Sequence, residues 1–111
     1  MELRDLYTMQ YDLDKYVIKT KNLELFNPKT RLTNTILAMM VETGEFANEV
    51  RSFKHWTTKP MSDKSIVMEE YVDILHFFLS IGNQLNFTAE EVEQAYQDKW
   101  EKNFDRQDNG Y

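Results

Sequence analysis

The sequence predicts an all-α fold in which four long helices pack in a bundle-like arrangement. Among 111 residues there are only three glycines and two prolines, which is too few for the many tight turns of an all-β chain. Apolar residues recur at helical spacing in four segments and make up 41% of the chain, enough for a packed core. A chain of this length forms one domain, residues 1–111.

The first two helices are expected on either side of a connection that contains a proline. Leucines and aromatic residues repeat at helical spacing over about 2–20, which predicts the first helix. The segment 21–30 is expected to be a connection, because Pro28 disfavours helix at the residue before it. A long apolar pattern then predicts the second helix over about 33–54.

The last two helices have local start signals. A third helix is expected over about 63–84, after a loop that contains a proline. Thr88 and Glu91 have the spacing of a capping box, which predicts a fourth helix over about 89–104. The tail 105–111 is polar with almost no apolar anchor, so we expect it to be mobile until a ligand or partner orders it.

Charge and composition exclude several classes of function. The chain has 19 acidic and 13 basic residues, giving a net charge of −6, so its mean field repels nucleic acid. The absence of cysteine excludes disulfides, thiolate metal sites and thiol nucleophiles. No apolar run approaches the roughly 20 residues of a membrane span. We therefore expect a cytoplasmic protein that binds neither nucleic acid nor membranes.

Three acidic side chains share one stripe of the second predicted helix. At about 100° per residue, Glu42, Glu45 and Glu49 lie within roughly 60° of one another. On an exposed helix a Lys or Arg four residues further on would pair with each glutamate. Those positions here hold Phe46, Glu49 and Phe53, so no cation within the helix neutralises the stripe.

The third predicted helix repeats this pattern. Glu70 and Asp73 are one turn apart, and there is no Lys or Arg anywhere in the segment 65–98. Two helices joined by a short loop tend to pack antiparallel, which would place Glu42 and Glu45 opposite Glu70 and Asp73 if both stripes face inward. The sequence therefore predicts that four carboxylates converge without a basic partner.

Converging carboxylates need protonation or a bound cation, because uncompensated buried charge is expensive. Oxygen ligands alone, without cysteine, favour Mg²⁺, with Mn²⁺ as an alternative. Magnesium is commonly shared between protein carboxylates and substrate phosphates, so such a site predicts a polyphosphate ligand. The residues also leave open two amphipathic helices with solvated acidic faces.

The order and spacing of these blocks resemble the all-α nucleoside triphosphate pyrophosphohydrolases, the superfamily of MazG and the dimeric dUTPases. Three blocks look like the dimeric dUTPase branch of bacteria and phages: VETGEFANEVRSFKHW (41–56), EEYVDILHFFLSIG (69–82) and AYQDKWEKNFDRQDNGY (95–111). The resemblance covers residues 6–111. It implies an all-helical, Mg²⁺-dependent enzyme that hydrolyses dUTP to dUMP and pyrophosphate.

The resemblance also implies roles for the acidic residues. Glu42, Glu45, Glu70 and Asp73 match the metal ligands of the family. Glu42 would in addition orient and deprotonate the attacking water, with Glu45 as the alternative for this catalytic role. Glu49 could help to hold a further ion or its waters.

Four residues match or flank positions that bind the base and sugar. Gln10, on the first helix, and Phe77, one turn beyond Asp73, match the base-binding glutamine and aromatic residue of the family. An amide can donate to and accept from a uracil edge, and a phenyl ring can stack on its face. His76 flanks the same stripe, and Trp56 lies on a loop from which it could cover the base. Each side chain could instead be structural, Gln10 as a buried amide and Phe77 as core.

The closing motif implies contacts to the phosphates. Lys99, Asn103, Arg106 and Gln107 match it, and Lys and Arg are natural partners for phosphate oxygens. The family usually has asparagine where this chain has Trp100, which puts one base or sugar contact in doubt. A solvated basic end is the alternative interpretation.

Other hypotheses stay open at this stage. The enzyme could be a broader house-cleaning pyrophosphohydrolase, because larger family members insert helices before the closing motif that this chain lacks. The fold could serve as a non-catalytic interaction module that binds a basic partner. A di-iron site is disfavoured, since it requires two Glu-x-x-His motifs and only the related Asp73-x-x-His76 is present. Four short helices leave much apolar surface, which predicts a homodimer or homotetramer.

Overall fold

The computed structural model describes residues 1–110 as four α-helices and one short 3₁₀ turn. The elements are α1 (Leu3–Thr20), η1 (Leu23–Leu25), α2 (Pro28–Val50), α3 (Lys64–Gln84) and α4 (Ala89–Asp108). No strand occurs within residues 1–110, so the all-α prediction is confirmed. None of the helices in this range is both long enough and apolar enough to cross a bilayer. Tyr111, the end of the expected tail, lies outside the described residues.

α2 begins and ends earlier than the sequence predicts. It starts at Pro28 because the Asn27 side chain accepts a hydrogen bond from the backbone N–H of Lys29 at 2.8 Å. Pro28 occupies the first helical position, where its missing N–H costs nothing. The helix ends at Val50 because Arg51 has a left-handed backbone with a φ of 65°. The acidic stripe therefore lies in the C-terminal half of α2.

α4 begins at the predicted capping box and extends further than predicted. The backbone N–H of Thr88 donates to the Glu91 carboxylate at 3.0 Å, and the Glu91 N–H donates to the Thr88 hydroxyl at 3.1 Å. The helix continues to Asp108, so residues 105–108 of the expected tail form its last turn. The mobility of this segment stays a prediction.

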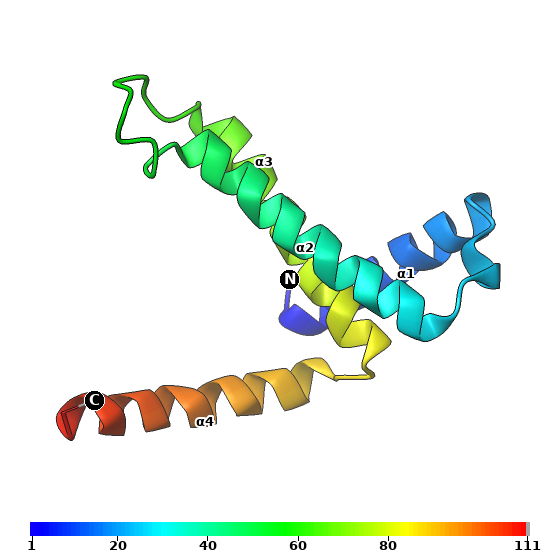
Figure 1. Ribbon diagram of the computed structural model, residues 1–111. Coiled ribbons are helices and arrows are strands. Elements are labelled where there is room, and N and C mark those ends of the chain that lie inside the picture. Colours follow the sequence, from blue (N-terminus) through cyan, green and yellow to red (C-terminus); the bar gives the residue numbers. More distant parts are fainter. Residues whose placement is uncertain (111) are drawn as a thin grey trace.

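α2 and α3 lie side by side and antiparallel, and α1 packs on α3 (Figure 1). Tyr7 and Leu79 are buried where α1 meets α3, and Ala89 of α4 joins them. A Cβ on Gly82 would lie 2.8 Å from the Tyr7 ring, so this close approach requires glycine. After its first two turns α4 projects away from the other helices (Figure 1). The long α2–α3 seam is thus the central feature of the chain.

Candidate functional site

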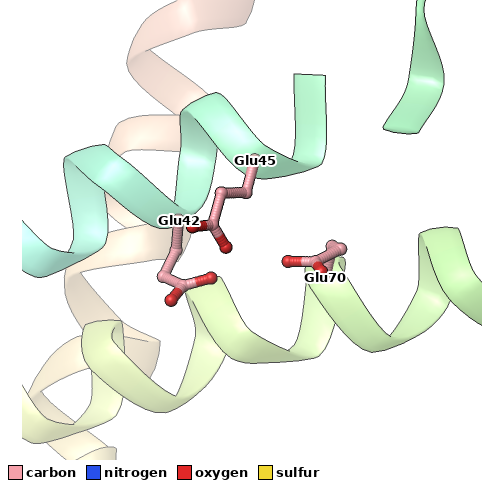
Figure 2. A group of neighbouring side chains, drawn as sticks. All are labelled: Glu42, Glu45 and Glu70. Atoms are coloured by element: carbon pink, nitrogen blue, oxygen red, sulfur yellow. The ribbon is translucent and has the colours of Figure 1, made fainter. Parts of the chain in front are cut away.

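Three of the four predicted metal ligands converge on the α2–α3 seam. Glu42 and Glu45 are one turn apart on α2, and Glu70 faces them from α3 (Figure 2). One carboxylate oxygen of each lies within 4.8 Å of those of the other two. None of the three forms an ion pair with another described residue. Antiparallel packing of the two acidic stripes thus concentrates negative charge at one point.

Burial and mutual repulsion raise the pKa of two of these carboxyls. For Glu42 the largest cause is loss of solvent, followed by Glu45 and then by Asp73 and Glu70. The pKa of Glu70 is raised first by loss of solvent and then by Glu45 and Asp73. Oε2 of Glu42 and Oε2 of Glu70 are buried without a hydrogen-bond partner. Both carboxyls are therefore poised to take up a proton or a cation.

Asp73 and Glu49 border this cluster without joining it. Asp73 is half-buried on α3, and its charge raises the pKa of both Glu42 and Glu70. Glu49 accepts a hydrogen bond from the Ser62 hydroxyl, and its backbone carbonyl accepts one from the Ser62 N–H at 3.0 Å. The end of α2 is thereby tied to the residues that precede α3, which keeps the two helices in register.

The donor set fits magnesium. All donors are carboxylate oxygens, and Glu42 and Glu70 each have a buried oxygen without a hydrogen-bond partner, as expected for ligands of a hard cation. Two oxygens bound to one Mg²⁺ can be at most about 4.2 Å apart, since each bond is about 2.1 Å. The oxygens here all lie within 4.8 Å of one another, so small side-chain rotations are enough to bring them within this limit.

A cavity lies one helical turn from the acids along the same seam. Ala38 precedes Glu42 by one turn of α2 and Phe77 follows Asp73 by one turn of α3, and both line this cavity. Its volume is about 350 Å³, within the range of small-molecule sites. The polar lining comes from Asp14, Arg31, Asn34, Thr35, Ser80 and Gln84. The structure thus places Phe77 in a cavity next to the acids.

Gln10 is buried beside this cavity with its amide already engaged. Its exposed fraction is 5%, and its Nε2 donates to Asp14 at 2.8 Å. Its Oε1 is hydrogen-bonded to Nδ1 of His76, and because an amide oxygen only accepts, that nitrogen carries the proton. Gln10 therefore connects His76 to Asp14, which lines the cavity. A direct contact of Gln10 with a base stays a prediction.

The other predicted substrate-binding residues are not brought to the acids within one chain. Trp56 lies beyond the C-terminal end of α2, 66% exposed and edge-on to Phe53 and His55. The cavity lies at the other end of the acidic stripe from Trp56. Residue 38 lines the cavity and residue 50 ends α2, and about 18 Å of helix separates these two residues. Lys99, Asn103 and Arg106 lie on the part of α4 that projects away (Figure 1).

Gln84 is a candidate site residue that sequence reasoning missed. Its Nε2 donates to Thr35 at 3.0 Å and to Ser80 at 3.1 Å, which holds the side chain across the seam. Its Oε1 is buried without a partner. The detectable signal was Ser80 and Gln84 at four-residue spacing beyond Phe77, because polar residues on an apolar stripe mark a cavity or a ligand.

Comparison of the sequence with known proteins identifies the family to which this chain belongs. The family model described as dUTPase matches residues 2–89 and 78–111. The dCTP pyrophosphatase of Enterobacteria phage T4 is 45% identical over 49 residues, which are 44% of this chain and 29% of that protein. This chain thus matches less than a third of the length of that relative. Since the two family matches together extend over nearly the whole chain, and the described residues are all-helical, the chain belongs to the all-α dUTPase family.

Proposed function

We propose that this chain hydrolyses dUTP to dUMP and pyrophosphate in a reaction that depends on Mg²⁺. The observation that carries the proposal is the convergence of Glu42, Glu45 and Glu70 one turn from a cavity of about 350 Å³. The acids suit a metal-bound triphosphate and the cavity suits a nucleoside. Membership of the dUTPase family supports the pairing of these two features.

The acidic residues would have two tasks, metal binding and proton transfer. Glu42, Glu45 and Glu70, with Asp73 beside them, would hold the metal, which supplies positive charge to the phosphates and acidifies bound water. Glu42 would also accept the proton of the attacking water, because its carboxylate would lie beside the metal that acidifies this water. The water oxygen would form a bond to the α- or the β-phosphorus, and the bond from that phosphorus to the oxygen that bridges the two would break, so that dUMP and pyrophosphate are the two products.

The base would occupy the cavity lined by Phe77. A phenyl ring on one wall can stack on a pyrimidine, and the unpartnered Oε1 of Gln84 can accept a hydrogen bond from the base. Uracil offers its N3–H for this contact. A buried acceptor that only the correct base satisfies supports strong discrimination, because a wrong base leaves it unpaired.

dCTP is a second candidate substrate. The name of the phage T4 relative supports it, and so does the chemistry of Gln84. An amide oxygen that accepts from uracil N3–H can equally accept from the amino group of cytosine. dTTP is the weakest candidate among the pyrimidines, because a close stack on Phe77 leaves little room for the methyl group.

To test the proposal, the protein is incubated with dUTP, dCTP or dTTP in the presence of Mg²⁺, and the products are identified by ³¹P NMR. The proposal predicts dUMP and pyrophosphate, no dUDP or orthophosphate, and the highest kcat/KM for dUTP. Preference for dCTP would support the second candidate, and equal kinetics on all three would indicate a general pyrophosphohydrolase. The absence of any monophosphate product would contradict the proposal.

A matched pair of variants tests the role of Gln84. Gln84→Leu removes the unpartnered acceptor, so kcat/KM for dUTP should fall at least about tenfold. Gln94→Leu on the exposed surface of α4 is the control and should leave kcat/KM unchanged. Equal values for both variants would place the base elsewhere.

A further inference from the structure

Arg31 is a charged residue of the cavity whose side chain has no partner in the part of the chain that the structure describes. It is the fourth residue of α2, half-buried, and lines the cavity of about 350 Å³. Its backbone carbonyl accepts a hydrogen bond from the Thr35 hydroxyl at 2.7 Å. Within residues 1–110 its guanidinium forms neither an ion pair nor a hydrogen bond. Five N–H donors, partly removed from water, are thus left without an acceptor.

The position of Arg31 in the helix adds to this cost. The N-terminus of an α-helix carries a partial positive charge, which favours acids and disfavours cations in the first turn. α2 has no acid in its first turn, and no Asp or Glu occurs in the segment 25–41. A half-buried cation that its own helix disfavours indicates a ligand rather than a role in folding.

A second, smaller cavity adjoins the first at Arg31. Its volume is about 210 Å³, and it shares Asp14, Ile18, Arg31 and Gln84 with the larger cavity. Gln84 donates to Thr35, one turn after Arg31, and its Oε1 is buried without a partner. The guanidinium therefore lies beside the amide oxygen to which the proposed function assigns a hydrogen bond from the base.

The order of residues along the seam determines which edge of a base Arg31 would meet. From the acids outward, the seam positions of α2 are Glu42, Ala38, Thr35 and Arg31. Arg31 is about 16 Å along the axis from Glu42. With the phosphates at the acids and the sugar next to them, Arg31 would face the part of the base that is farthest from the sugar. In a pyrimidine that part includes position 4, next to N3.

Uracil and cytosine differ at position 4. Uracil carries a carbonyl oxygen there, which accepts hydrogen bonds, whereas cytosine carries an amino group, which donates them. Oε1 of Gln84 can accept from either base, so this residue alone does not select between them. A guanidinium only donates, so Arg31 suits the carbonyl oxygen and not the amino group.

We propose that Arg31 determines a preference for dUTP over dCTP by donating a hydrogen bond to the carbonyl oxygen at position 4 of uracil. With cytosine, the donors of Arg31 would face those of the amino group and both would be left unpaired. Thymine carries the same carbonyl oxygen as uracil, so Arg31 does not affect the choice between dUTP and dTTP. The inference rests on the proposed function, because it takes the base to lie in the cavity beside Gln84.

The first test compares ratios of kcat/KM in variants matched for charge. Arg31→Gln introduces an acceptor beside a donor, so the ratio of dUTP to dCTP should fall at least about tenfold, whereas the ratio of dUTP to dTTP should not change. Lys29→Gln removes a cation at an exposed position of the same turn and should leave both ratios at their wild-type values. Arg31→Lys keeps a group that donates but cannot accept, so this variant should still prefer dUTP.

Thermal unfolding separates this role from a structural one. The Tm of Arg31→Gln should not fall below that of the wild type, because the described chain offers the guanidinium no partner and the helix N-terminus disfavours its charge. A lower Tm together with an unchanged ratio of dUTP to dCTP would show that Arg31 supports only the fold, and would overturn the inference.

The outcomes distinguish this inference from the proposed function. If the wild type hydrolyses dUTP and Arg31→Gln keeps the wild-type ratio of dUTP to dCTP, the inference fails and the proposed function stands. A wild type that prefers dCTP would also overturn the inference.

A binding measurement decides the inference if the wild type hydrolyses no nucleotide, a result that would refute the proposed function. NMR titration with deoxyuridine and with deoxycytidine then reports on the cavity without turnover. The wild type should bind deoxyuridine more tightly, and Arg31→Gln should remove the difference. Equal affinity of the wild type for the two nucleosides would overturn the inference.

Discussion

Glu42 combines a buried carboxylate oxygen that has no hydrogen-bond partner with a second carboxylate one turn away. Either feature alone would raise the pKa of Glu42, and together they allow this carboxyl group two states. With a cation bound it serves as a ligand, and without one it favours the protonated form. The same reasoning applies to Glu70 across the seam, so the site opposes folding of the metal-free protein at high pH.

The pH dependence of stability follows from the direction of this shift. The folded pKa of Glu42 lies above its unfolded value, so the native state binds more protons and stability falls as pH rises through the folded pKa. Glu42→Gln should therefore raise the Tm of metal-free protein at about pH 8 and have little effect at about pH 4. Thermal unfolding in EDTA measures this, and a Tm gain that is equal at both pH values would contradict the assignment.

Removing single acids should separate catalysis from folding. Glu45→Gln and Asp73→Asn should each lower turnover by about 10²-fold or more while the helical circular dichroism is kept. Loss of one charge from a crowded cluster relieves repulsion, so the helical fold should remain stable. Glu69→Gln, at an exposed position beside Glu70, is the matched control. Near wild-type rates for both test variants would mean that the acids are only a solvated face.

At the scale of elements, the helices could be predicted wherever a local signal was unambiguous. The capping box at Thr88 gave the start of α4, and helical periodicity predicted α1 and α3. The predicted start of α2 is wrong by five residues, because a proline by itself indicates a connection, whereas the Asn27 cap makes Pro28 the first residue of the helix. The acidic stripe was visible in the sequence because it depends on periodicity alone. The cavity was not, since Gln84 and Thr35 meet only once the helices pack.

The contact between α1 and α3 gives a sharp test of the packing. Gly82→Ala would place a Cβ 2.8 Å from the ring of the buried Tyr7, so either the ring or the helix must move. Such overpacking costs about 1–3 kcal/mol, which lowers the Tm of a domain of this size by several degrees. Ser65→Ala at an exposed position of α3 is the control and should change Tm little. A Gly82→Ala protein as stable as the control would show that α1 does not pack at this position.

The last turn of α4 tests whether the closing motif serves catalysis or folding. Deleting residues 105–111 removes Arg106 but leaves Trp100 and Phe104. Turnover should fall at least about tenfold, the loss expected for one strong charged contact to phosphate. Tm should remain nearly unchanged, because α4 contacts α1, and the α4 residues that pack on the buried cluster of Tyr7 and Leu79 are Ala89 and Val92, at the other end of the helix. An unfolded truncated protein would show a structural role, and normal turnover would show that the segment is dispensable.

For the whole molecule, the sequence predicted the convergence of acids on α2 and α3 better than it predicted the position of α4. The acids of α2 and α3 converge because neighbouring antiparallel helices leave few alternatives. The position of α4 depends on the short connection before Thr88, which has no periodic signature in the sequence. The acids therefore lie at the centre of the described chain, whereas Lys99 and Arg106 lie on the projecting part of α4.

The most direct test of the central claim is the rate of pyrophosphate release from dUTP as Mg²⁺ is titrated into metal-free protein. The account predicts no turnover in excess EDTA, a saturable recovery with Mg²⁺ or Mn²⁺, and no recovery in the Glu45→Gln variant, because the acids have no internal cation and can bind phosphates only through metal. Full turnover of dUTP in excess EDTA would contradict it.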